Sequence, residues 1–178
     1  MKDVTSTSFG LVIAFFLPGL AAFYSLCYWS SRVDQLFKTF LTTDSNVSLF
    51  LLVIAAAVTM GLQITLVRWL LFEILICRSQ KFGPSFFKKL GTDENRLVAF
   101  KAVVDEHYRY HQFWGGMCIV IPGFVVGSLR ESWNTLTFGQ VTWTIIVFVL
   151  CEVLTGCAAY DAYKRYSTRA KEILGGGE

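Results

Sequence analysis

The stretch VSLFLLVIAAAVTMGLQITLV, residues 47–67, holds 21 residues and no charged side chain. An α-helix rises about 1.5 Å per residue, so roughly 20 apolar residues cross the hydrocarbon core of a bilayer, which is about 30 Å thick. The stretch therefore predicts a membrane-spanning helix. Arg68 follows it, and apolar residues then resume as far as Cys77. A single helix over 47–76 would have to tilt or project beyond the membrane.

Three further stretches have the same character, at about 9–29, 110–129 and 141–163. The chain of 178 residues is 54% hydrophobic and 16% charged, with a mean hydropathy of +0.51, whereas soluble domains carry about 25% charged residues. This composition argues against a soluble enzyme and a nucleic-acid-binding domain. We expect an all-α integral membrane protein, a single domain over 1–178 built as a four-transmembrane-helix bundle.

Basic residues are distributed unevenly between the two sides that four spans define. Twelve Lys and Arg residues fall in the N-terminal end, the 78–110 segment and the C-terminal end, whereas three fall in the opposite connections. Cytoplasmic flanks are enriched in Lys and Arg, so we expect both termini in the cytoplasm, in a bacterial inner membrane. Aromatic residues near the span ends fit this orientation; they are Tyr28, Trp29, Trp133 and Trp143 on the outer side and Trp69, Trp114, Tyr160, Tyr163 and Tyr166 on the inner side.

The 78–110 segment is the longest connection and carries most of the polar surface. Its first half contains a basic aromatic patch suited to a protein partner or to lipid headgroups, made of Phe86, Phe87, Lys88, Lys89 and Arg96. The alternative is a solvated loop whose aromatic rings fold onto the helices.

The second half of this segment predicts a helix that continues into the third span. The residues Thr92, Asp93, Glu94 and Asn95 are typical of a helix start. After them, residues at spacings of three and four form one stripe: Leu97, Phe100, Val104, His107, His111 and Trp114. We expect helical cytoplasmic extensions of spans two and three, packed against each other.

His107 and His111 are the two histidines of the chain, and their i, i+4 spacing places them on one helix face. Counting along the spans brings them to the inner membrane boundary together with Arg68, Glu73 and Asp161, and we predict an interface cluster there. Three interpretations are open: a metal pair, histidines that hydrogen-bond to acids such as Glu73 or Asp161 within a helix interface, and a pH sensor. We predict no metal, no cofactor and no catalytic residue.

Glu152 lies eleven residues into the fourth stretch, at about the middle of a membrane core. Acids at such depth mark ion or proton pathways, and Thr59 and Gln63 are polar at comparable depth. We predict an intramembrane polar pathway of these three residues. The alternative is that Glu152 is protonated and donates a hydrogen bond between helices.

Small residues predict close helix packing. Gly123 and Gly127 form a GxxxG pattern in the third span, and Gly156 lies among small residues of the fourth. A chain of four spans leaves much lateral surface, so we expect a homo-oligomer. Residues 172–178, which end in three glycines and Glu178, are expected to form a flexible tail.

These observations favour a non-enzymatic, homo-oligomeric inner-membrane protein that contacts membrane lipids. It would act as a sensor, pore or docking subunit, with the 78–110 segment meeting a cytoplasmic protein. One alternative is a small ion or proton channel or transporter that uses Glu152. Another is a membrane enzyme that acts on a lipophilic substrate near His107 and His111.

Overall fold

The computed structural model describes residues 10, 12–42, 47–71 and 93–175, and these residues form helices and turns with no strand among them. The prediction of an all-α protein is therefore confirmed. In chain order the elements are η1 (Val12–Phe16), α2 (Leu17–Leu26), α3 (Ser31–Thr42), α4 (Val47–Arg68), α6 (Glu94–Val103), η3 (Val104–Tyr108), α7 (Arg109–Ser132) and α8 (Phe138–Gly175).

Within the described residues, three helices are long and apolar enough to cross a membrane. They are Val47–Leu71, Glu94–Ser132 and Phe138–Ile173. The first predicted span does not qualify by itself, because its helix ends at Leu26 and the chain then bends by 118° into α3. The two halves of this bent pair reach the required length and apolar character only together, which would make a fourth span.

Helix α3 was not predicted, because the charges of Arg32, Asp34 and Lys38 suggested a plain outer connection. Between these charges, apolar residues recur at helical spacing, and the ring of Phe37 contacts the ring of Phe23. Side chains of one face thus pack on α2 while charged ones remain outside, which is sufficient to stabilise a short amphipathic helix.

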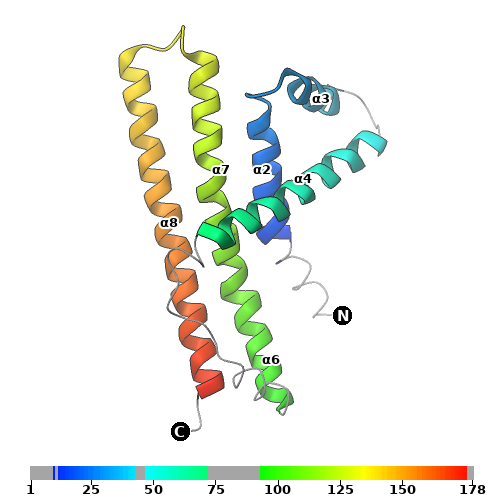
Figure 1. Cartoon of the computed structure of the whole chain (residues 1–178), viewed down its shortest axis with the longest axis vertical. Coiled ribbons are helices and arrows are strands. Elements are labelled where there is room, and N and C mark those ends of the chain that lie inside the picture. The colour runs from blue at the N-terminus through cyan, green and yellow to red at the C-terminus, as the bar shows by residue number, and fades with distance from the viewer. Residues whose placement is uncertain (1–9, 11, 43–46, 72–92, 176–178) are drawn as a thin grey trace.

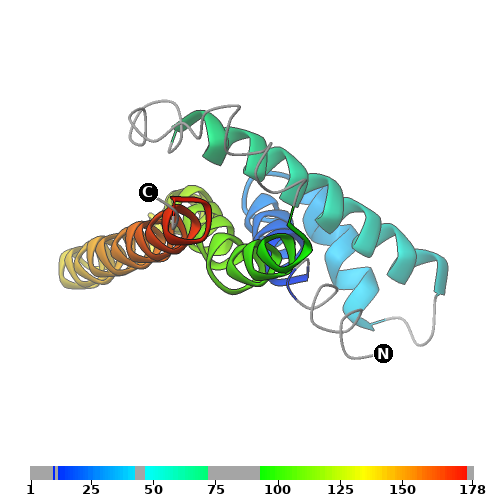
Figure 2. The ribbon, with the colours of Figure 1, turned by 90° about the horizontal axis from the view of Figure 1, so that it is seen from below.

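The four main helices form a row rather than a square bundle (Figures 1 and 2). Helices α7 and α8 stand side by side and antiparallel, α2 lies against the other side of α7, and α4 crosses α2 obliquely. Seen from below, α8 extends to one side and the beginning of α4 lies on the other, while the end of α4 comes close to α7 (Figure 2).

The predicted helix from the cytoplasmic segment into the third span is present as one rod of 39 residues, Glu94–Ser132. Asp93 caps it, because its carboxylate accepts the backbone N–H groups of Asn95 at 3.0 Å and Arg96 at 3.3 Å. A π-helical turn, η3, interrupts the regular winding just before α7. The lower part packs against α8, whereas residues 72–77 of the expected partner extension lie outside the described residues.

Helix α8 begins with a capping box and is longer than the predicted span. The Gln140 side-chain oxygen accepts the Thr137 N–H at 2.9 Å. The helix continues to Gly175, so residues 172–175, which were expected in a flexible tail, are helical. Ser167 and Ala170 are buried, and this packing extends the helix beyond the length that apolar composition alone suggests.

The closest helix approach uses two glycines for which no contact was predicted. A side chain added to Gly19 would overlap the backbone of Ala57, and one added to Gly61 would overlap the backbone of Phe15. These two glycines therefore permit α4 to cross the η1–α2 helix in backbone contact.

The predicted glycine positions pack differently from one another. Gly123 and Gly127 both face α2, since a Cβ at Gly123 would lie 3.5 Å from Ser25 Oγ and one at Gly127 would lie 2.7 Å from Tyr28 Cβ. Gly156 has open space around it. The GxxxG pattern thus joins α7 to α2 within the chain, and Gly156 is not part of that contact.

Candidate functional site

A buried polar chain connects three helices where α4 ends. Arg68 and His111 are each 1% exposed. Arg68 Nη1 lies 2.9 Å from His111 Nε2, and His111 Nδ1 lies 2.9 Å from the carbonyl oxygen of Ala159. Helices α4, α7 and α8 are therefore tied together by side chains that water does not reach.

The hydrogen-bond roles of His111 follow from its two partners. A carbonyl oxygen only accepts, so Nδ1 carries the proton and donates to Ala159. Arg68 only donates, so Nε2 accepts from the guanidinium, and the imidazole is neutral. Both ring nitrogens are then engaged in the fold, which leaves neither for a metal ion or for proton transfer.

Three tyrosine rings surround this polar chain. The Arg68 guanidinium carbon lies 5.9 Å from the ring centre of Tyr108, within the range of a cation–π contact. The ring centres of His111 and Tyr163 are 5.1 Å apart, and those of Tyr108 and Tyr166 are 5.0 Å apart. We call these five side chains, together with the Ala159 carbonyl, the joint.

Tyr163 and Tyr166 were predicted at a membrane interface and not as members of this cluster. Their spacing of three residues on α8 matches the spacing of Tyr108 and His111 on the facing helix. Such matched spacing is the signal by which antiparallel helices pair their side chains. The matched spacing does not by itself assign Tyr163 and Tyr166 to this cluster, because the sequence does not give the register of the two helices.

Two predicted members of the cluster lie elsewhere. Asp161 is exposed and pairs with Arg165 on its own helix at 2.8 Å, so its predicted hydrogen bond to the histidines is wrong. His107 Nε2 is buried, makes no hydrogen bond within the described residues, and lies 3.8 Å from Glu106 Oε2. Glu73 lies outside the described residues.

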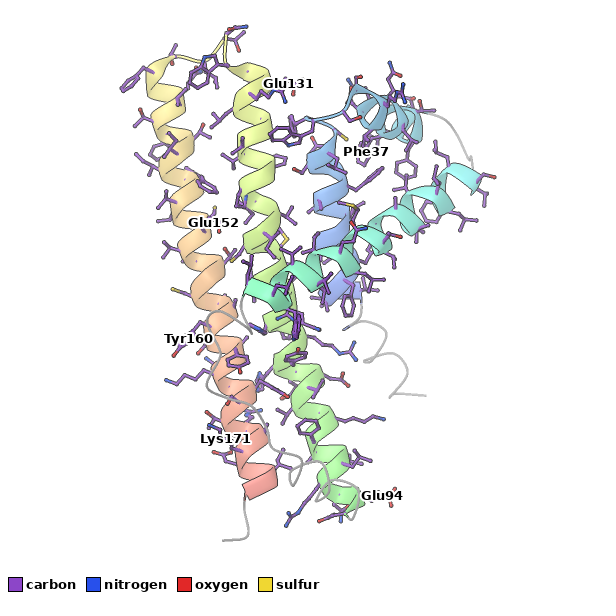
Figure 3. All side chains as sticks on the ribbon, in the orientation of Figure 1. Phe37, Glu94, Glu131, Glu152, Tyr160 and Lys171 are labelled. Atoms are coloured by element: carbon purple, nitrogen blue, oxygen red, sulfur yellow. The ribbon has the colours of Figure 1, made fainter. Side chains whose placement is uncertain are left out.

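The three residues of the predicted intramembrane pathway lie on two helices, α4 and α8. Thr59 and Gln63 are exposed on α4, and the Thr59 hydroxyl donates to the Ala55 carbonyl of its own helix. Glu152 lies on α8 (Figure 3). Its Oε1 is buried and has no hydrogen-bond partner among the described residues. No hydrogen bond among the described residues links Glu152 to Thr59 or Gln63.

Below the joint, α6, η3 and the end of α8 carry most of the charged side chains of the described residues. We call residues 94–108 and 160–175 the stalk, whose upper end includes the three tyrosines of the joint; Figure 3 shows Glu94 at the start of α6 and Tyr160 and Lys171 along the lower part of α8. Across the stalk, Arg169 Nη1 lies 3.1 Å from Glu106 Oε2. The rings of Phe100 and Tyr166 also meet there, with their centres 6.4 Å apart.

The predicted docking patch falls mostly outside the described residues, since these do not include Phe86, Phe87, Lys88 and Lys89. Arg96 is described, and its Nε lies 3.1 Å from the Asp93 carboxylate in the cap of α6. No group of three side chains suited to a metal ion occurs in the part of the chain that is described.

No protein-family model, curated protein or solved structure matches this chain. The function of the chain must therefore be inferred from the geometry of the joint and of the stalk.

Proposed function

We propose that this chain is a multi-pass protein of the bacterial inner membrane whose stalk docks a cytoplasmic protein, and that it acts as a sensor or docking subunit and not as an enzyme. Both termini then lie in the cytoplasm. The single observation that carries the proposal is the position of the joint, between the apolar helices and the charged stalk.

The length of the helices supports a projecting stalk. The helix Glu94–Ser132 has 39 residues, which corresponds to about 58 Å at 1.5 Å per residue, whereas the membrane core is about 30 Å thick. His111 lies 21 residues before Ser132, hence about 31 Å from that end. The joint therefore falls near the inner boundary of the membrane, and the residues before it extend into the cytoplasm.

The joint gives the stalk a physical connection to the membrane helices. A partner that moves α6 against α8 would displace Tyr108 and Tyr166, whose rings are in contact. The Tyr108 ring in turn contacts the guanidinium of Arg68, the last residue of α4. Because packed cores change between discrete arrangements and do not deform continuously, a small displacement in the stalk is passed to α4.

We do not propose transport, since no hydrogen bond among the described residues joins Glu152 to Thr59 or Gln63. An enzyme at the histidine pair has little support, because both nitrogens of His111 are engaged in hydrogen bonds.

Photocrosslinking in cells tests the docking proposal. Val98 is 62% exposed on α6, so a side chain at this position can reach a molecule bound to the stalk. A photoreactive residue at Val98 is expected to give a discrete adduct with a soluble protein. The matched control is Trp143, 67% exposed on the apolar part of α8, where adducts with lipid or with the chain itself are expected. The same adduct pattern at both positions would contradict the proposal.

We further propose that α8 contacts a second copy of the chain through Gly156. Leu150, Val153 and Leu154 are exposed on the same helix, and a glycine among them allows another helix to approach closely. Gly156→Leu is expected to shift the native mass of the detergent-extracted protein from oligomer to monomer, with unchanged helix content.

Gly139→Leu is the matched control, because Gly139 also has open space around it and lies at the beginning of α8. An oligomer that survives Gly156→Leu, or one that both substitutions dissociate equally, would count against the contact at Gly156.

A further inference from the structure

A cavity of about 540 Å³ lies at the end of the molecule opposite the stalk, where α2, α3 and α7 meet. This volume falls within the range of small-ligand sites, about 300–1,000 Å³. Its lining comprises Tyr24, Cys27, Tyr28, Trp29, Ser30, Ser31, Asp34, Arg130 and Glu131. Figure 3 shows Glu131 at the upper end of α7, on the side that faces α3. The walls thus combine aromatic rings with charges of both signs.

Two of the charges are available to a ligand. Asp34 is already paired, since Lys38 Nζ lies 2.7 Å from its carboxylate. Arg130 and Glu131 have no ion-pair partner among the described residues. They are neighbours in a helix and therefore do not face each other. The cavity consequently offers one cation and one carboxylate at separate points of its wall.

The Arg130 guanidinium lies over the exposed Trp29 ring. Its central carbon lies 5.5 Å from the Trp29 ring, and Trp29 Nε1 donates to the Gly123 carbonyl at 3.2 Å. A guanidinium positioned over an aromatic ring keeps its N–H groups at the edge, where they are suited to bind phosphate oxygens in pairs.

The position of the cavity relative to the membrane favours a lipid as its ligand. Under the proposed membrane orientation, on which this inference rests, the cavity lies at the outer headgroup level, where Tyr and Trp side chains concentrate. Val126 is exposed one helical turn from Arg130 on the same face of α7. An acyl chain attached to a headgroup in the cavity therefore has an apolar surface to follow into the membrane.

We propose that this cavity binds the headgroup of a phospholipid that carries both a phosphate and a primary amine, with Arg130 binding the phosphate and Glu131 binding the ammonium group. Phosphatidylglycerol lacks the amine. Phosphatidylcholine has a quaternary ammonium group that donates no hydrogen bond. The carboxylate of Glu131 therefore distinguishes the aminophospholipid from both.

Native mass spectrometry of the full chain in detergent tests this site. Phosphatidylethanolamine, phosphatidylglycerol and phosphatidylcholine with identical acyl chains are offered in equal amounts. Phosphatidylethanolamine is expected to be retained about fivefold more than either competitor, because one additional hydrogen bond to the exposed Glu131 contributes about 1 kcal/mol.

Two substitutions test the contributions of Arg130 and Glu131 to lipid binding separately. Arg130→Gln is expected to weaken retention of all three lipids, since each contains a phosphate. Glu131→Gln is expected to reduce phosphatidylethanolamine to the level of phosphatidylglycerol and to leave the other two lipids unchanged. Arg165→Gln and Glu172→Gln remove matched charges from the exposed surface of α8 and are expected to change nothing.

Equal retention of the three lipids, or a Glu131→Gln protein that keeps its preference, would overturn the proposal. Displacement of the lipid by an equal concentration of free phosphoethanolamine would also overturn it, because the site would then serve a soluble ligand. This experiment reports on the α3 end of the molecule, so its failure leaves the docking proposal for the stalk untouched.

Discussion

His111→Ala is expected to lower the free energy of unfolding by about 3 kcal/mol, the value typical of breaking a buried pair by removing one partner. The substitution removes the acceptor of the Arg68 guanidinium and the donor to the Ala159 carbonyl, both inside the packed structure. A buried polar group without its partner costs far more than an intact hydrogen bond contributes. The measurement is unfolding of the detergent-solubilised protein by sodium dodecyl sulfate, followed by tryptophan fluorescence.

Gln112→Ala is the control for this substitution. Gln112 is the next residue of the same helix and is only half-buried, so its truncation is expected to cost less than about 0.5 kcal/mol. Equal losses for His111→Ala and Gln112→Ala would mean that the joint contributes nothing beyond ordinary helix packing.

Gly61→Val is expected to separate α4 from the first helix and to destabilise the fold by about 3 kcal/mol, at the upper end of the range for overpacking. The added side chain would meet the backbone of Phe15, and backbone cannot move aside as the end of a flexible side chain does. Gly19→Val acts on the same crossing from the other side, through Ala57.

Unfolding of the detergent-solubilised protein measures the effect, and the smaller substitution Gly61→Ala serves as a second variant if the valine protein fails to accumulate. Gly139→Ala is the matched control, since that glycine has open space around it. A crossing that tolerates valine at both Gly19 and Gly61 would show that the two helices do not approach to backbone contact.

The long helices were predictable because their signals are local. About 20 uncharged residues in succession leave no alternative to a buried or membrane-spanning helix, and Asp93 caps its helix through atoms two and three residues away. Arg68 and His111 could be assigned to one level by counting residues along antiparallel spans. Their contact with each other depends on helix rotation, which the count does not provide.

The remaining features depend on how helices meet. Gly19 and Gly61 belong to a crossing between segments about 40 residues apart, and isolated glycines in apolar runs give no sign of such a partner. The pattern GxxxG suggested a contact for Gly123 and Gly127 but not that α2 would supply it. Helix α3 was missed because its charged and apolar residues are interspersed in the sequence. The apolar residues gather on one face only once the segment is known to be a helix.

The joint and the cavity near Arg130 lie at opposite ends of α7. His111 is near its beginning and Arg130 near its end, so one helix connects the proposed cytoplasmic partner with the proposed lipid. This arrangement suits a subunit that anchors a partner to a membrane of particular lipid composition. The two sites are tested separately, and the joint is the feature on which the proposed role of the stalk depends.

A double-mutant cycle between Arg68 and His111 tests that feature most directly. Arg68→Met, His111→Leu and the double variant replace the buried polar pair by apolar side chains of similar volume, and unfolding is measured for each. We expect a coupling energy of about 2 kcal/mol, with the double variant more stable than the sum of the two single losses implies. Additive losses, within about 0.5 kcal/mol, would show that Arg68 and His111 do not act as a pair and would contradict the proposed role of the joint.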